Sequence, residues 1–185
     1  TDNVRYVDVG INSSGNADPA FTIVGALGGY AYCASGPFAV GTDTAGQDLI
    51  IFTGGTLTTN ERMRVTDSVI NMLNPFGYAT GTGGTVTQAT SRTTGVTLNK
   101  PTGTITMFSA AQASQAIVTF TLTNSFISAT DYLQVQHISA TNGGAWQIST
   151  VCSSGSATIT IRNISNASIT EATPLKFILF KAVTA

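Results

Sequence analysis

The side chains of this sequence that could carry acid–base chemistry are few and scattered. The sole histidine, His137, falls in an alternating run in which Leu133 and Val135 share its face, so a core or interface position is favoured over a general base. The acidic residues before position 80 show no spacing that would hold two carboxylates across a cleft, and they suit turns and caps better. No GxSxG elbow, GxGxxG frame or P-loop is present. We therefore expect no catalytic residues, and the chain is not predicted to be an enzyme.

Candidate metal ligands are equally sparse. Cys33 and Cys152 lie far apart in the sequence and neither belongs to a CxxC or Cys/His cluster, so each is interpreted as a small buried apolar residue rather than part of a metal site or a disulfide. Asp43, Thr44 and Asp48 have oxygens that suit Ca²⁺, but their spacing matches no EF-hand loop. The sequence predicts neither a metal nor a cofactor.

Ligand binding is the remaining kind of chemistry. Carbohydrate sites combine an aromatic ring with amide and hydroxyl donors, displayed on loops of a rigid scaffold. The only tryptophan, Trp146, follows a turn that contains Asn142, and Tyr132 opens the preceding apolar and polar alternation. These three residues are the candidate binding residues. For Trp146 the alternative is that it begins a strand and packs in the core, which its residue type favours, and Tyr132 has the same ambiguity.

Strands must position these side chains. In residues 117–123 the apolar Val118, Phe120 and Leu122 alternate with threonines, which is the period of a strand with one buried face. The same period recurs over 132–138, 157–161 and 176–181, and turns rich in Asn, Gly and Ser separate the runs. This pattern predicts an all-β fold, with an antiparallel, jelly-roll-like β-sandwich over residues 85–185.

The chain is predicted to divide in two. Residues 1–80 carry a net charge of −4 and residues 81–185 a net charge of +3, and a Pro- and Gly-containing linker is expected over 74–84. Before the linker, residues 1–73 predict a small Gly-rich β-meander, with strands at 7–11, 21–24, 29–32 and 49–52. Residues 66–73 have helical potential, with Asp67 or Ser68 as N-cap.

Composition excludes several partners. Only 9 % of the 185 residues are charged and the net charge is −1, so there is no electrostatic footprint for a nucleic acid or an anionic membrane. No apolar run is long enough for membrane insertion, and Thr1 opens the chain without a signal segment. Thr-rich strands with few charges are suited to burial between protomers, and a first segment of this size needs help to bury a core. Assembly into a homo-oligomer is therefore expected.

Two stretches resemble a known family. Thr53-Gly54-Gly55-Thr56 followed by Asn60-Glu61-Arg62-Met63-Arg64-Val65 resembles a repeat of bacteriophage fibre proteins. The stretch 77–100, together with the chain's close at 175–185, resembles a C-terminal module of tailed-phage structural proteins.

The resemblance implies a homotrimeric virion fibre, assembled in the cytoplasm of the bacterial host beside other virion proteins. In this interpretation the distal β domain attaches to the host surface through a glycan or an outer-membrane receptor. The alternative is a head fibre or capsid decoration protein with a structural role and no receptor binding.

Overall fold

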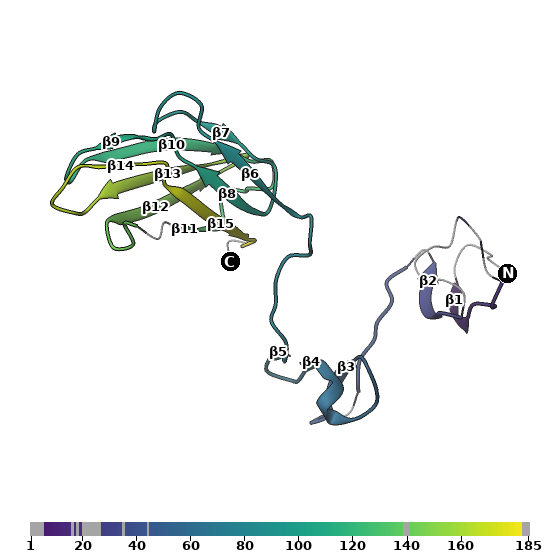
Figure 1. The fold of residues 1–185 in the computed structure, drawn as a ribbon. Coiled ribbons are helices and arrows are strands. Elements are labelled where there is room, and N and C mark those ends of the chain that lie inside the picture. Colours follow the sequence, from purple (N-terminus) through teal and green to yellow (C-terminus); the bar gives the residue numbers. More distant parts are fainter. Residues whose placement is uncertain are drawn as a thin grey trace. The chain divides into compact units, whose positions relative to one another are not determined.

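A computed structural model describes residues 6–15, 17, 19, 27–34, 36–43, 45–138 and 141–182. The chain divides into two compact units, Thr1–Phe76 and Gly77–Ala185 (Figure 1). The described residues form strands and one short 3-10 turn, so the all-β class is confirmed, and no helix among them is long and apolar enough to cross a membrane. The strand expected at 21–24 and the candidate ligand Thr44 lie outside the described residues.

The first unit contains a hairpin and a three-stranded sheet. Strand β1 (Tyr6–Ile11) pairs antiparallel with β2 (Gly29–Ala34), so that Ile11 lies opposite Gly29. In the sheet, β4 (Glu61–Val65) lies between β3 (Leu49–Phe52) and β5 (Ile70–Met72), all antiparallel, and the turn η1 (Thr58–Asn60) leads into β4. This order is that of a meander, because strands adjacent in sequence are adjacent in the sheet.

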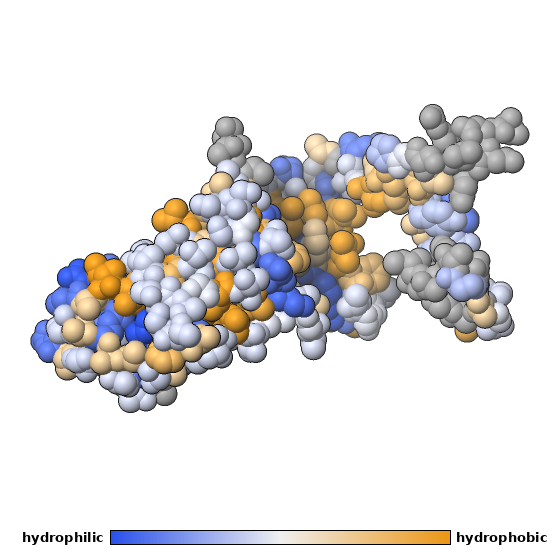
Figure 2. Space-filling view, turned by 90° about the horizontal axis from the view of Figure 1, so that it is seen from above, coloured by the Kyte–Doolittle hydropathy of each residue, from blue (hydrophilic) through white to orange (hydrophobic). Residues whose placement is uncertain are grey.

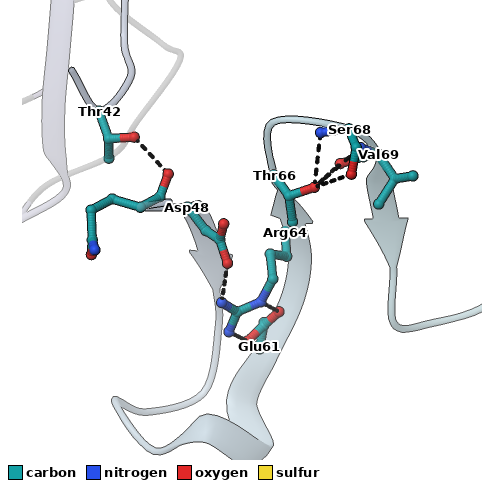
Figure 3. A network of polar contacts seen from close by, with 8 residues as sticks. Thr42, Asp48, Glu61, Arg64, Thr66, Ser68 and Val69 are labelled. Atoms are coloured by element: carbon teal, nitrogen blue, oxygen red, sulfur yellow. Dashed lines mark hydrogen bonds and ion pairs between the residues drawn. The ribbon is translucent and has the colours of Figure 1, made fainter. Parts of the chain in front are cut away.

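The prediction of a helix over residues 66–73 is wrong. Thr66 closes a turn instead: its Oγ1 accepts the backbone N–H groups of Ser68 (3.2 Å) and Val69 (3.1 Å) (Figure 3). A hydroxyl that satisfies nearby N–H groups competes with helix formation. The β-branched Ile70 that follows enters β5 and pairs with Val65 of β4.

The second unit is a β-sandwich. One sheet has the order β12-β13-β10-β7 and the other β11-β15-β8-β6, while β9 and β14 pair separately. The strands are β6 (Gly83–Thr87), β7 (Val96–Thr97), β8 (Thr102–Thr106), β9 (Ala110–Gln112), β10 (Ile117–Thr123), β11 (Tyr132–His137), β12 (Trp146–Ser153), β13 (Ser156–Asn163), β14 (Ile169–Glu171) and β15 (Pro174–Phe180). Strand β6 begins within the predicted linker 74–84 and before the sandwich boundary expected at 85.

The sandwich is mixed rather than purely antiparallel, which corrects the sequence prediction. β6 pairs parallel with β8, and β7 pairs parallel with β10. The chain passes from β6 to β7 in the other sheet before it returns as β8. Such a crossover brings β8 back in the same direction as β6, which a hairpin cannot do.

The core lies between the two sheets of the second unit. Alternate residues of the long strands fill it, as the period of two predicted: Phe120 and Leu122 on β10, Ile159 and Ile161 on β13, and Leu175, Phe177 and Leu179 on β15 are all at most 3 % exposed. Gly103 on β8 allows β6 to approach, because a Cβ there would lie 2.7 Å from the Gly84 carbonyl oxygen and from Leu98. All of the core residues belong to the second unit, so the sandwich fills its core without side chains of the first unit.

Candidate functional site

Trp146 and Asn142 meet at a half-buried carboxylate, that of Glu171. Trp146 opens β12 and is 7 % exposed. Its indole Nε1 donates to Glu171 Oε1 (2.9 Å), and Asn142 Nδ2 donates to Glu171 Oε2 (2.6 Å). The structure thus brings together two of the sequence-derived candidates, but their donor nitrogens are both engaged by Glu171.

Arg92 extends this cluster. Its guanidinium lies with its carbon 5.1 Å from the centroid of the Trp146 ring, within cation–π range. Nε donates to Gln112 Oε1 (3.0 Å), Nη1 to the Glu171 carbonyl (2.9 Å) and Nη2 to Thr173 Oγ1 (3.1 Å). Burial lowers the pKa of Arg92, and the nearby Glu171 charge opposes that shift. These contacts join the 88–94 loop to β9, β12 and β14. The cluster therefore stabilises the packing of this loop against the three strands.

Tyr132 lies apart from this cluster. It begins β11, whereas Asn142 follows the other end of that strand. Tyr132 is 58 % exposed and its ring centroid lies 6.4 Å from that of Phe180, which is 44 % exposed. The Tyr132 hydroxyl donates to Gln134 Oε1 (2.7 Å). Of the three candidates, Tyr132 is therefore the one displayed at the surface.

The surface around Tyr132 is the outward side of the β11-β15-β8-β6 sheet. We call it the β11/β15 face, and it is formed by the residues of these strands that alternate with the core residues. Lys176 lies there between Gln136 of β11 and Thr104 of β8, and Ile178 lies between Gln134 and Thr102. A shallow depression of about 200 Å³ is lined by Thr102, Gln134, Gln136, Lys176, Phe177 and Ile178.

Sequence reasoning missed most of this face. Gln134 and Gln136 alternate with the core residues Leu133 and Val135, so their outward position could have been read from the strand period. The strand β15 that supplies Lys176 and Phe180 is about 40 residues away in the sequence, and only the pairing of β11 with β15 brings it alongside. No local signal places the aromatic pair Tyr132–Phe180.

His137 makes a structural contact. Its Nε2 lies 2.8 Å from the Gly143 carbonyl oxygen, and because a carbonyl only accepts, Nε2 carries the proton. His137 is half-buried, and its Nδ1 is buried without a hydrogen-bond partner among the described atoms. The imidazole thus links the end of β11 to the loop that precedes β12.

An ion cluster stabilises the three-stranded sheet of the first unit. Arg64 Nε donates to Glu61 Oε1 (2.8 Å), and Nη1 donates to Asp48 Oδ2 (2.6 Å), which joins β4 to the residue before β3 (Figure 3). The bond from Arg64 lowers the pKa of Glu61 and the two carboxylates raise that of Arg64. Across the described part of the chain, no group of three or more His, Cys, Asp or Glu is placed to hold a metal ion.

The first unit lacks an apolar core in its described residues. Among the side chains whose burial is described there, Glu61 alone is buried, while the large apolar side chains of residues 50–76 are between 41 % and 79 % exposed. Neighbouring Ile50 and Ile51 are both exposed, so both faces of the three-stranded sheet are open. We call these side chains the open apolar surface: Ile50, Ile51, Phe52, Leu57, Val69, Ile70, Met72, Leu73 and Phe76. Figure 2 shows apolar side chains at the surface of this part of the chain.

No family model, curated protein or solved structure matches this chain. The resemblance to phage fibre modules therefore stays a prediction from the residues that carry it.

Cys33 and Cys152 are both free and half-buried, and burial raises the pKa of the Cys152 thiol.

Proposed function

We propose that this chain is a structural protein of a bacteriophage virion, a homotrimeric fibre whose sandwich unit attaches to the surface of the bacterial host. The observation that carries the proposal is the open apolar surface of the first unit. Nine large apolar side chains on 50–76 face away from any core of their own chain. A surface of this kind is typical of a segment that is completed by assembly.

Burial against further copies would stabilise this segment. Each such side chain contributes about 1.5–3 kcal/mol when it is fully removed from water. Arg64, Glu61 and Asp48 are already paired with one another, and Arg62 donates to backbone carbonyl groups, so burial of the surface leaves no ion of the Arg64 cluster without a partner. β3 and β5 are also edge strands with open backbone groups. Copies of the same chain around a symmetry axis would cover the side chains and the edges together.

The sandwich unit supplies a rigid base for attachment. Its own core is complete, so its outer faces are available for contacts with other molecules. The faces are poor in charge and rich in hydroxyl and amide groups, such as Thr104 and Gln136 on the β11/β15 face and Thr119 and Thr160 on the other sheet. These groups can exchange hydrogen bonds with a glycan or with another protein.

The alternative is a head fibre or capsid decoration protein that assembles in the same way and binds no receptor. The two functions differ in a single measurable property, the affinity for cells. Labelled chain of known solution mass would be sedimented with a panel of bacterial strains, and the same mixture without cells would serve as control. We expect an assembled chain that pellets with at least one strain. An assembled chain that stays in the supernatant with every strain favours the alternative, and a monomer contradicts both.

A further inference from the structure

The β11/β15 face carries one full charge. Lys176 is the only Lys, Arg, Asp or Glu within β6, β8, β11 and β15, and it lies on an interior strand of the sheet. Its cross-strand neighbours Gln136 and Thr104 are neutral. The six residues that line the depression include no carboxylate. The Lys176 ammonium therefore lies exposed in a setting of hydroxyls and amides, where an external anion can reach it.

An aromatic pair lies four residues beyond Lys176 on β15, about 13 Å along the strand. Phe180 is opposite Tyr132 in the strand register, their rings are tilted by 33°, and both are exposed. Between the rings and Lys176 lie Ile178 and Gln134, which are also opposite each other. The Tyr132 hydroxyl engages Gln134 Oε1, so the amide nitrogen of Gln134 points away from the tyrosine. Along these two strands the face thus changes from apolar rings to amides to a cation.

We propose that the β11/β15 face binds a carboxylate-bearing saccharide. The Tyr132–Phe180 pair packs against the apolar face of one sugar ring, Gln134 and Gln136 exchange hydrogen bonds with hydroxyls of the saccharide, and Lys176 pairs with the carboxylate of a sugar further along it. This inference rests on the proposed function and names the ligand class of the attachment step.

Charge argues against the other occupants of this face. Three copies that met on it around an axis would bring three Lys176 ammonium groups together with no anion on the face to neutralise them, which is unfavourable. A nucleic acid is bound through several phosphate contacts, and a single lysine supplies one. A face with the single cation Lys176, two aromatic rings and amide groups is complementary to a saccharide in which one sugar is acidic and the others are neutral.

The test measures binding of fluorescent tetragalacturonate to the full chain in low-salt buffer, with maltotetraose as the neutral comparison. Four proteins are compared: the natural sequence, Lys176→Gln, Lys176→Arg and Lys100→Gln. Lys100 lies outside the depression, so Lys100→Gln is the matched control for loss of one positive charge. A fifth protein, Tyr132→Ala, removes one ring of the aromatic pair at an exposed position.

We expect saturable binding of tetragalacturonate and at least about tenfold weaker binding of maltotetraose. Lys176→Gln should weaken tetragalacturonate binding about tenfold or more, Lys176→Arg should retain it, and Lys100→Gln should leave it unchanged. Tyr132→Ala should weaken binding of both sugars, with unchanged melting temperature. Equal affinities of Lys176→Gln and Lys100→Gln, or no binding of tetragalacturonate, would overturn the inference.

The same preparations separate this inference from the proposed function. An assembled chain that pellets with cells but ignores tetragalacturonate retains the proposed function and loses the acidic-sugar site. Pelleting that is equal for Lys176→Gln and the natural sequence places the attachment on another surface. A chain that binds tetragalacturonate but is monomeric retains the site and contradicts the fibre.

Discussion

Asp131 binds the two residues that follow β15, Lys181 and Ala182. Lys181 Nζ donates to its Oδ2 (2.5 Å), the Ser128 N–H donates to the same oxygen (2.7 Å), and the Ala182 N–H donates to Oδ1 (3.2 Å). These bonds all favour the anion, and they lower the pKa of Asp131 below its usual 3.8, with the Lys181 bond as the main cause. Lys181 is 59 % exposed, so solvent and salt screen the ion pair.

Acid should therefore weaken the sandwich through Asp131. A carboxyl whose folded pKa is depressed stabilises the fold above its unfolded pKa, and this contribution is lost as the pH falls through the folded pKa. Melting curves between about pH 5 and about pH 2 should show a smaller loss of melting temperature for Asp131→Asn than for the natural sequence. Parallel curves for the two proteins would show that Asp131 has no linked proton.

The cluster around the half-buried Glu171 predicts a larger effect. Glu171→Ala leaves the Trp146 indole N–H, the Asn142 amide and the Arg92 charge without this carboxylate. Removal of a partner from a buried hydrogen-bonded group costs about 1–3 kcal/mol, and we expect a loss of that size in urea unfolding of the sandwich. Thr170→Ala, at the exposed neighbouring position on β14, is the matched control and should change stability by less than about 0.5 kcal/mol. A similar small loss for both variants would contradict the structural role of the cluster.

Strand periodicity was the most informative signal in the sequence. The alternation over 117–123, 132–138 and 157–161 identified β10, β11 and β13, because in each of them one face is buried and the other is open. The helix prediction for residues 66–73 was wrong because it used the spacing of the apolar residues alone. It did not consider the Thr66 hydroxyl, which closes a turn. The sequence carries no local signal of the Arg92 cluster, since the hydrogen-bond partners of the Arg92 guanidinium lie between 15 and 81 residues away from it.

β15 shows why the choice of variant matters for tests of assembly. It lies in the interior of its sheet and places Leu175, Phe177 and Leu179 in the core. Deletion of 175–185 would therefore unfold the sandwich, and loss of oligomers in that variant would say nothing about their interface. Assembly is better tested with substitutions on strands that carry no core residue.

β5 offers such a substitution. Ile70 is 65 % exposed on an edge strand, so Ile70→Asp places a charge within the open apolar surface without disturbing a core. If copies bury this surface, the variant should shift to smaller species in light scattering while the melting temperature of the sandwich stays the same. Ile117→Asp, at a similarly exposed isoleucine on β10, is the control and should leave the mass unchanged. An unchanged mass of Ile70→Asp would exclude β5 from the interface.

The two units differ in how they can be stable. The sandwich buries seventeen apolar residues in one cluster, all of them after position 95, whereas the described residues of the first unit bury a single carboxylate. A segment whose apolar side chains are mostly exposed gains stability when other molecules cover them. We therefore propose that folding of the first unit depends on assembly, whereas the sandwich has a complete core of its own.

The mass of the full chain in solution tests this dependence most directly. Light scattering coupled to size-exclusion chromatography should give three times the mass of one chain, and the value should hold on dilution through the micromolar range. A mass of one chain at every concentration would contradict the proposal that copies of this protein complete its first unit.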